Sequence, residues 1–332
     1  MIKISIIIPV YNRPEELSEL LMSISRQNNN DFEVIVVEDG STVSSEQVCL
    51  DFKSKIDIQY ITQNNTGPGI ARNTGANKSE GDWLIFLDSD CILPDDYLEI
   101  VNEKIVNESF DCFGGPDKAH ESFNSIQKAI GYAMSSILTT GGIRGSIEKM
   151  DKFYPRSYNL GVKKDVFASI NGFSEMRFGE DIDFSMRLLE KGFTTKLLKE
   201  VFVYHKRRNN FNSFFKQVYN SGIARINLEI RHPKTIKLVH WLPSFFVIGN
   251  LLIALSALLS PTLLLLLTVI PVVILIHSAT QTKEFKTSIL AVVASFVQLF
   301  GYGLGFIKAL IFRKIFKKEE FHSFNKNFYG KK

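Results

Sequence analysis

Short apolar runs alternate with segments of helical periodicity through the first half of the chain. Ile4–Val10 is an uncharged, β-rich run of the kind that forms a strand buried within a sheet. Pro14 suits the first position of a helix, and apolar residues then recur at i, i+3, i+4 and i+7 over Leu17–Ile24. The pattern therefore predicts a strand followed by a helix that buries one face.

The same alternation continues to about residue 110. Further strands are predicted at Val34–Val37, Ile58–Ile61 and Trp83–Leu87. Helices are predicted over residues 68–79 and from Pro94 to about Val106. This order of strands and helices predicts an α/β domain with a parallel sheet and helices on its faces. Such sheets bind ligands at the carboxyl ends of their strands, where the polar clusters of this sequence lie.

After residue 110 the periodicity is weaker. The pattern there predicts, in order, a mainly apolar helix Phe123–Leu138, a glycine-rich loop Thr140–Gly145, a strand Tyr158–Val162, a helix near Asp181–Lys191 and a strand Val201–Tyr204 that ends at His205.

Two stretches of the second half contain no Asp, Glu, Lys or Arg: Trp241–Thr282 and Thr287–Ile307. The first is long enough for two helices of about 20 residues, the length that crosses a bilayer, and the second for one more. The predicted organisation is a catalytic domain at 1–205, a basic amphipathic juxtamembrane segment at 206–240, a membrane region of two to three helices at 241–312 and a basic tail at 313–332.

Charge is distributed unevenly between these parts. The net charge of +4 combines −10 in residues 1–205, +7 in residues 206–240, +1 in residues 283–286 and +6 in residues 308–332. An acidic N-terminal domain argues against nucleic acid as a ligand. The basic segments flank the apolar runs, where they would meet anionic lipid headgroups. We therefore expect membrane lipid to be a partner of the second half.

The three cysteines, Cys49, Cys91 and Cys112, have neither metal-ligand spacing nor the even count of a disulfide framework. They are predicted to be buried thiols in a reducing compartment. The N-terminal segment MIKISIIIPVYNRP has too short an apolar run for a signal peptide. We therefore expect localisation at the cytoplasmic membrane, with the N-terminal domain facing the cytoplasm.

Asp88-Ser89-Asp90 directly follows the predicted strand Trp83–Leu87. Two carboxylates separated by one residue at the open end of a buried strand suit Mg²⁺ or Mn²⁺, with substrate phosphates completing the coordination. In isolation such a triplet is more often an ordinary surface turn. The preceding strand makes the metal site the better interpretation.

Glu38-Asp39-Gly40-Ser41 occupies the equivalent position after the second strand. A carboxylate there could accept the imide N–H of a uracil, while Tyr11, after the first strand, could stack on the base. The alternative is an acid that caps a tight turn.

Gly67-Pro68-Gly69 precedes a helix that carries Arg72 near its start. Backbone N–H groups at a helix start and a guanidinium both favour an anion. This is not the dinucleotide fingerprint, whose glycines directly follow the first strand, so a nucleotide-dependent oxidoreductase is disfavoured.

Glu180-Asp181-Ile182-Asp183 follows Gly179 and begins a helical pattern. Acids are favoured in a first helical turn by the dipole alone, which is the purely structural explanation. The functional interpretation makes Asp181 a general base, ionised at neutral pH, that takes the proton of a hydroxyl group as that group attacks a sugar C1. His205 is either a surface histidine or a further metal ligand.

Six segments occur together and in order: SIIIPVYNR, VVEDGS, GPGIARNTG, WLIFLDSD, NLGVKKDVF…GF and GEDIDFSMRL. This series resembles the family 2 glycosyltransferases, inverting enzymes with a GT-A nucleotide-sugar-binding fold, over about residues 3–205. The segment that follows resembles the membrane-anchored branch of the succinoglycan-biosynthesis type. The resemblance implies a GT-A domain, α/β with a mostly parallel sheet, and C-terminal transmembrane helices.

The resemblance also implies roles for individual residues. The nucleotide base and ribose would be bordered by Pro9, Tyr11, Arg13 and Asp39. The diphosphate would approach Arg72 and the helix start at Gly67. Asp88 would approach the ribose or the metal, and Asp90 would bind Mg²⁺ or Mn²⁺, with His205 as a further candidate ligand. The acceptor would be served by Asp181, with Glu180 beside it.

Two departures from the family pattern bear on these implications. Glu38 stands where the family often has a second Asp, which leaves the details of the base contact open. The QxxRW motif of processive synthases is absent, so transfer of a single sugar is expected rather than polymerisation.

The resemblance implies direct displacement from a nucleotide sugar to a hydroxyl of a polyprenyl-linked or glycan acceptor. UDP-sugars are favoured as donors through Asp39 and the family resemblance. Two alternatives stay open. One is a polyprenyl-phosphate glycosyltransferase like the dolichol-phosphate mannose synthases, whose phosphate acceptor needs no base. The other is a non-catalytic membrane module that binds nucleotide sugars.

The membrane topology is ambiguous from the sequence. Residues 206–240 should lie on the cytoplasmic side, where nucleotide sugars are made. Three full crossings would then put the Lys-rich tail outside, against the positive-inside tendency. Either that tendency fails in this chain, or one apolar segment is re-entrant or interfacial.

Overall fold

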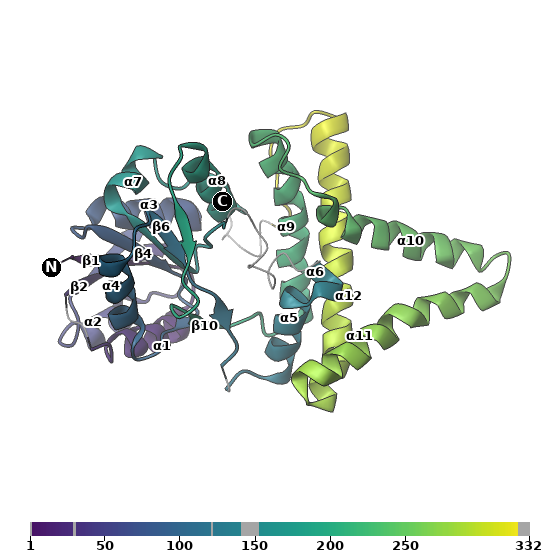
Figure 1. Cartoon of the computed structure of the whole chain (residues 1–332), viewed down its shortest axis with the longest axis horizontal. Coiled ribbons are helices and arrows are strands. Elements are labelled where there is room, and N and C mark those ends of the chain that lie inside the picture. Colours follow the sequence, from purple (N-terminus) through teal and green to yellow (C-terminus); the bar gives the residue numbers. More distant parts are fainter. Residues whose placement is uncertain (1, 29–30, 121, 141–152, 325–332) are drawn as a thin grey trace. The chain divides into compact units, whose positions relative to one another are not determined.

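A computed structural model of the chain describes residues 2–28, 31–120, 122–140 and 153–324, which form two compact units (Figure 1). The first unit contains the described residues up to 120 and those from 153 to 206. The second contains residues 122–140 and 207–324. Of the predicted glycine-rich loop Thr140–Gly145, only Thr140 is among the described residues.

Four parallel strands form one half of the main sheet of the first unit. They are β1 (Ile4–Val10), β2 (Phe32–Asp39), β3 (Ile58–Gln63) and β4 (Trp83–Leu87), in the spatial order β3-β2-β1-β4. Two of them have the predicted bounds, and β2 and β3 extend beyond theirs. The carboxyl ends of β1, β2 and β4 therefore lie along one edge of the sheet.

The other half of this sheet is mixed. Beyond β4 lie β8 (Asn159–Lys163), β6 (Cys112–Gly114) and β9 (Thr195–Leu197), which complete a seven-stranded sheet within the described residues. β8 runs antiparallel to both β4 and β6, while β9 is parallel to β6. The prediction of a mostly parallel α/β sheet is confirmed.

A small second sheet is formed by β5 (Cys91–Ile92), β10 (Val203–His205) and β7 (Asp117–Lys118), in the order β5-β10-β7. The pairing of β10 with β5 sets His205 opposite Cys91. The end of the predicted strand Val201–Tyr204 is thereby brought next to the triplet Asp88–Asp90.

Helices cover both faces of the main sheet. One face is covered by α1 (Pro14–Ile24), α2 (Glu46–Phe52) and α4 (Tyr97–Asn107). The other face is covered by α3 (Pro68–Lys78), α7 (Lys164–Ser169) and α8 (Glu180–Glu190). α4 starts at Tyr97 rather than at the predicted Pro94, because the chain first makes a turn in which the Tyr97 N–H donates to the Pro94 carbonyl at 3.2 Å.

The second unit is helical. In the described residues its α-helices are α5 (Ser125–Ser135), α6 (Ile137–Thr140), α9 (Phe211–Arg231), α10 (Leu242–Ser256), α11 (Leu266–Thr282) and α12 (Phe285–Ala309), and a π-helical turn, Leu310–Ile315, extends α12. The single helix predicted for Phe123–Leu138 is wrong, because the chain breaks at Ser136. The Ser136 hydroxyl accepts the Leu138 N–H at 3.2 Å, and such a side chain starts a new helix by capping it.

α9 and α12 run side by side and are parallel, with glycines where they meet (Figure 1). A Cβ added at Gly222 of α9 would lie 2.2 Å from the Tyr302 carbonyl oxygen. A Cβ added at Gly305 of α12 would lie 2.0 Å from the Tyr219 carbonyl oxygen. The two backbones therefore approach as closely as small residues permit.

Within the part of the chain that the structure describes, two helices are long and apolar enough to cross a membrane, Pro261–Thr282 and Phe285–Ile315. α10 has 15 residues, which makes it shorter than the two equal helices of about 20 residues expected within Trp241–Thr282. The predicted range of two to three apolar helices therefore corresponds to two long helices and one short one.

Candidate functional site

Polar side chains converge at the edge where β1, β2 and β4 end and α3 and α8 begin. Asp88 follows β4, Arg72 lies on α3, and Glu180 is the first residue of α8. Arg72 is 16 residues from Asp88 and 108 residues from Glu180 in the sequence, yet it donates hydrogen bonds to both. The prediction that the acidic motifs lie together at one sheet edge agrees with this arrangement.

Arg72 is the centre of a buried ion cluster. Its Nη2 atom lies 2.6 Å from Asp88 Oδ1, and its Nη1 atom lies 3.1 Å from Glu180 Oε1. The side chain is only 3% exposed, and its guanidinium lies 5.4 Å from the centre of the Phe173 ring. One cation thus faces two carboxylates in a site largely shielded from water, where charges interact strongly.

Burial raises the pKa of Glu180 to about 7, and the neighbouring Asp181 carboxylate adds to this rise. The Arg72 guanidinium opposes it without cancelling it. Glu180 therefore exchanges its proton near neutral pH. This behaviour is typical of carboxyl groups in functional sites, although structural ion clusters produce it too.

Asp181 is held from two directions. Its Oδ1 atom accepts the backbone N–H of Ile182 at 2.8 Å, and its Oδ2 atom lies 3.3 Å from Arg156 Nε. Gly179, in the left-handed region at φ +84°, lets the chain turn into α8 just before these acids. The Asp181 carboxylate is thereby fixed beside the Arg72 cluster.

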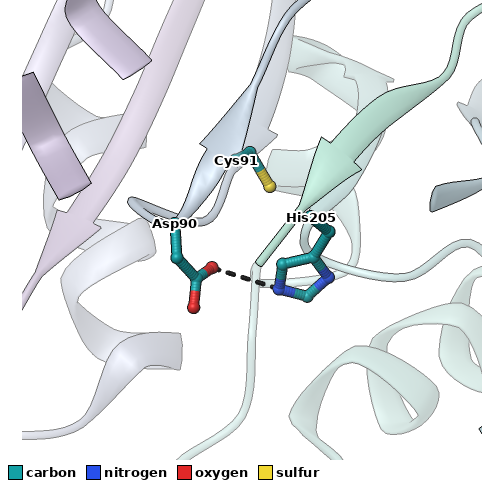
Figure 2. Close-up of side chains that lie close together, drawn as sticks. All are labelled: Asp90, Cys91 and His205. Carbon is teal, nitrogen blue, oxygen red and sulfur yellow. Dashed lines mark ion pairs between the residues drawn. The ribbon is translucent and has the colours of Figure 1, made fainter. Parts of the chain in front are cut away.

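Asp90 is the centre of a second cluster. One carboxylate oxygen bonds the Arg13 guanidinium, and the other lies 3.1 Å from His205 Nε2 (Figure 2). Ligand atoms of Asp90, Cys91 and His205 all lie within 4.8 Å of one another. The ring of His205 also packs against that of Tyr158, with centroids 5.0 Å apart.

The donor set of this cluster fits a divalent cation. A carboxylate oxygen from the turn before β5 and an imidazole nitrogen from the end of β10 approach one point, and both are ligands that Mn²⁺ accepts, while Mg²⁺ prefers the oxygen alone. The Cys91 thiol is 3.5 Å from the Tyr158 carbonyl oxygen, to which it donates, and it is fully buried. Asp90 and His205 are therefore the residues that would hold the ion.

Asp39 is committed to the loop that leads into α3. Its Oδ1 atom accepts the Gln63 amide at 2.8 Å and the Thr66 N–H at 2.9 Å, and its Oδ2 atom accepts the Gly67 N–H at 2.8 Å. Gly67 has φ +97°, a conformation that favours glycine. In this structure Asp39 shapes the loop in front of α3, and its predicted contact with a nucleotide base stays a prediction.

Glu38 has a structural role, which agrees with the interpretation of this motif as one whose acid caps a tight turn. Its carboxylate accepts the Ser45 N–H at 2.7 Å at the start of α2, and it also bonds the Ser41 and Tyr60 hydroxyls. These partners bury it and fix the turn after β2. Glu38 thus stabilises the turn that presents Asp39.

Pro9 and Tyr11 lie at the end of β1. Pro9 is paired with Val37 of β2, whereas the pairing of β1 with β4 stops at Ile7, so a residue without an N–H is tolerated there. Tyr11 follows the strand and is half-buried. Both therefore lie at the same sheet edge as Arg13.

Two arginines near the site have no place in the sequence motifs. Arg156 bonds Asp181, and Arg177 Nη1 lies 3.3 Å from Asn65 Oδ1 in the loop before α3. The Arg177 side chain passes 3.8 Å from the position of a Cβ added at Gly67. Neither residue follows a strand or belongs to a spaced pattern, so only their position in the fold reveals them.

Comparison with known proteins links this site to glycosyl transfer. Residues 5–166 match the family described as Glycosyl transferase family 2. An uncharacterized glycosyltransferase of Haemophilus influenzae is 31% identical over 223 residues, which make up 63% of this chain and 71% of that protein. Glycosyltransferase AglE of Haloferax volcanii is 26% identical over 253 residues, covering 75% of this chain and 81% of AglE.

Other similarities cover less or are more distant. Glycosyltransferase GlyA of Streptococcus pneumoniae is 43% identical over 127 residues, which are 38% of this chain but only 18% of GlyA. Among solved structures, the mannosyltransferase PcManGT of Pyrobaculum calidifontis, in complex with GDP-Man and Mn²⁺, superposes with a TM-score of 0.66. It covers 89% of this chain and 87% of its own at 14% identity, which is a likeness of fold.

Proposed function

The chain belongs to glycosyl transferase family 2, and on that premise we propose that it moves one sugar from a UDP-sugar to a hydroxyl group of a lipid-linked or polysaccharide-precursor acceptor. Membership of the family makes the protein a glycosyltransferase that uses a nucleotide-sugar donor, rather than a non-catalytic module. The choice of UDP, the acceptor and the roles of individual residues are the proposal.

The observation that carries the proposal is the position of Asp181 beside the Arg72 cluster. Asp181 is anchored by Arg156 and by the Ile182 N–H, and its neighbour Glu180 is bonded to Arg72. A fixed carboxylate next to a cationic centre supports a base on one side of the reacting carbon and a diphosphate on the other.

The proposed reaction is one displacement. The acceptor oxygen forms a bond to the anomeric carbon while Asp181 takes the proton of that hydroxyl group. The bond from the anomeric carbon to the phosphate oxygen breaks, and the nucleoside diphosphate leaves with its electron pair. Because attack and departure occur on opposite faces, the anomeric configuration inverts.

Chain residues around the leaving group have complementary roles in this proposal. Asp88 and Glu180 hold the Arg72 guanidinium in a fixed position on α3. From that position Arg72 stabilises the negative charge of the departing diphosphate. Asp90 and His205 hold Mg²⁺ or Mn²⁺, which supplies positive charge for the phosphate oxygens when bound. Pro9, Tyr11, Arg13 and Asp39 border the base and ribose.

The remaining assignments concern the whole chain. Residues 1–205 form the catalytic domain, 206–240 the juxtamembrane segment, 241–312 the membrane region and 313–332 the basic tail. The protein resides at the cytoplasmic membrane with its catalytic domain in the cytoplasm, where nucleotide sugars are made. The two long apolar helices support membrane association.

Asp181→Asn in the detergent-solubilised full chain tests the role of the base. We expect nucleotide-sugar binding within about two-fold of wild type and a transfer rate lower by about 10²–10⁴, the usual contribution of a general base. Asp165→Asn is the matched control, because Asp165 also stands in a first helical turn and accepts the N–H of the next residue. It should transfer at the wild-type rate.

The readouts are calorimetric binding of a panel of nucleotide sugars and transfer to extracted lipid acceptors. If Asp181→Asn retained more than about a tenth of the wild-type rate, Asp181 would not be the base. Full transfer by the variant to a polyprenyl phosphate would instead indicate an enzyme whose acceptor needs no base.

A further inference from the structure

α10 and α11 form an apolar hairpin that precedes α12 in the chain and has both of its ends beside α12 (Figure 1). Its 42 residues from Trp241 to Thr282 include no charged side chain. Leu258 and Leu259 at the tip are 85% and 90% exposed. Only 11% of the most apolar 18-residue stretch of Pro261–Thr282 is buried. A surface of this size and composition is covered by another apolar phase in the working protein.

The backbone N–H groups and hydroxyls at the tip find partners within the tip itself. The N–H groups of Leu258, Leu259 and Ser260 donate to carbonyls of the preceding turn, at 3.1, 2.9 and 3.1 Å. Pro261 has no N–H, and the Ser260 and Thr262 hydroxyls bond each other at 2.8 Å. Local pairing of this kind is what the hydrocarbon of a bilayer demands, because water is absent there.

The first arm of the hairpin is too short to cross a bilayer. α10 has 15 residues and so is about 22 Å long, whereas the hydrocarbon core is about 30 Å thick. Its tip residues, Ser256–Ser260, carry no charge that would place them in water beyond the far side. The hairpin therefore reaches into the hydrocarbon without emerging from it.

α12 is long enough to cross, but its neighbour α9 is not suited to hydrocarbon. The two helices pack along their lengths, with Val218 against Gly301 and Gly222 against Tyr302 and Phe306. If α12 spanned the bilayer through its uncharged stretch, α9 would carry Lys216 into the hydrocarbon beside it, because Phe215 and Val218 pack against Gly301. Charges at that depth are costly, so this pair of helices belongs outside the core of the membrane.

The segment after α12 folds back along α9. Ser323 exchanges hydrogen bonds with Asn220 at 2.8 and 2.9 Å, and Glu320 lies 2.9 Å from Arg231. The carbonyl of Phe321 accepts the Asn227 amide at 3.4 Å. The exposed charged residues after α12 are thus tied to a helix that starts only five residues after the first unit ends.

We propose that the second unit is monotopic: the α10–α11 hairpin enters one leaflet from the cytoplasmic side, and α9 and α12 lie at the membrane surface. Lys237, before the first arm, and Lys283 and Lys286, after the second, are exposed at the base of the hairpin and meet anionic headgroups there. Residues 206–240 and the basic tail then share one side of the membrane, in keeping with the positive-inside tendency.

This inference rests on the proposed membrane association and not on the reaction, so its test does not measure sugar transfer. Single cysteines replace exposed residues in the full chain: Asn209→Cys before α9, Leu259→Cys at the hairpin tip and Glu319→Cys after α12. The wild-type chain is the background, because its three cysteines are buried. A membrane-impermeant maleimide is added to spheroplasts and to inverted vesicles of a bacterial expression host.

We expect Asn209→Cys and Glu319→Cys to react only in inverted vesicles, and Leu259→Cys to react in neither preparation until detergent is added. Reaction of Leu259→Cys in spheroplasts would mean that the hairpin crosses the bilayer. Opposite sidedness of Asn209→Cys and Glu319→Cys would mean that α12 crosses it. Reaction of Leu259→Cys in inverted vesicles would mean that the hairpin lies outside the lipid, exposed to water on the cytoplasmic side.

A pair of charge substitutions tests the lipid contact separately. The double variant Leu258→Asp/Leu259→Asp should bind vesicles containing anionic lipid at least about ten-fold more weakly than wild type, because carboxylates resist transfer into hydrocarbon. Val106→Asp is the matched control, since Val106 is an exposed apolar residue of the first unit. Equal vesicle binding by the double variant and the control would overturn the proposal.

Discussion

At the scale of single residues, the candidate site is built from ion pairs between three arginines and four carboxylates. Arg72 bonds Asp88 and Glu180, Arg13 bonds Asp90, and Arg156 bonds Asp181. Asp88, Asp90, Glu180 and Asp181 therefore each have a defined cationic neighbour before any substrate is bound. Incoming phosphates would have to compete with the carboxylates for the arginines, and a divalent ion would have to compete with the arginines for the carboxylates. Substitution of one member of an ion pair should therefore change ligand binding or stability measurably.

Glu180 gives folding a pH dependence that can be predicted with its sign. Its pKa rises from 4.5 in the unfolded chain to about 7 in the folded one, through burial and then through Asp181. The folded state then binds the extra proton between these values. The stability contributed by Glu180 is fully present below pH 4.5 and is lost as the pH rises through 7.

Glu180→Gln should remove this dependence. We expect the free energy of unfolding of wild type, relative to the variant, to fall by about 2–3 kcal/mol between pH 5 and pH 8. Trp241→Phe in both proteins leaves Trp83, which is buried in the first unit, as the fluorescent reporter of urea unfolding. A difference between the two proteins that did not change with pH would contradict the raised pKa.

His205 and Cys91 are adjacent candidates for the metal site that can be separated by substitution. His205→Ala should raise the Mn²⁺ concentration for half-maximal binding at least about ten-fold, because a nitrogen ligand beside Asp90 is lost. Cys91→Ser should leave it within about two-fold, since that thiol is directed to the Tyr158 carbonyl. Electron paramagnetic resonance of Mn²⁺ in titrations of both variants measures this, and the reverse ranking would reject His205 as a ligand.

At the scale of elements, the hydrophobic pattern was sufficient to predict the bounds of the strongest strands. It was not sufficient to predict which strands pair with each other in the sheet. The strands Ile4–Val10 and Trp83–Leu87 are uncharged apolar runs, and their bounds were predicted correctly. The antiparallel insertion of β8 between β4 and β6 is set by contacts between distant segments, and no local pattern encodes it. The break at Ser136 was missed because the apolar pattern continues through a residue whose hydroxyl caps the next helix.

The close approach of α9 and α12 depends on glycine and makes its own prediction. Gly222→Ala places a methyl group 2.2 Å from the Tyr302 carbonyl oxygen, so the helices must separate. We expect the substitution to destabilise the second unit by about 2–4 kcal/mol. Trp241 fluorescence in a Trp83→Phe background reports on that unit during denaturation in detergent.

Gly131→Ala in α5 is the matched control, since nothing lies within 4 Å of its added Cβ. Alanine is the better helix former, so this change should be neutral or stabilising by up to about 1 kcal/mol. Equal stability of the Gly222→Ala and Gly131→Ala variants would show that the α9–α12 contact is looser than the structure has it.

At the scale of the whole molecule, the sequence divides the chain clearly into a part with candidate catalytic residues and a part with apolar membrane helices. It predicts less clearly how the residues of each part are arranged in space. Asp88, Asp90 and Asp181 were selected because each follows a strand or starts a helix, and those positions are local properties. Arg156 and Arg177 act only through the folded chain, which is why motif spacing missed them. The glycosyltransferase family and its α/β fold are confirmed, whereas the site roles stay predictions.

The stereochemical course of transfer tests the central claim, one displacement at the anomeric carbon, most directly. The donor found by the binding panel is supplied with its sugar α-linked to the nucleotide, and the anomeric proton coupling of the first product is measured by nuclear magnetic resonance. A single displacement at this site predicts a β-linked product. An α-linked product would contradict the account, because retention requires either two displacements or departure and attack on the same face.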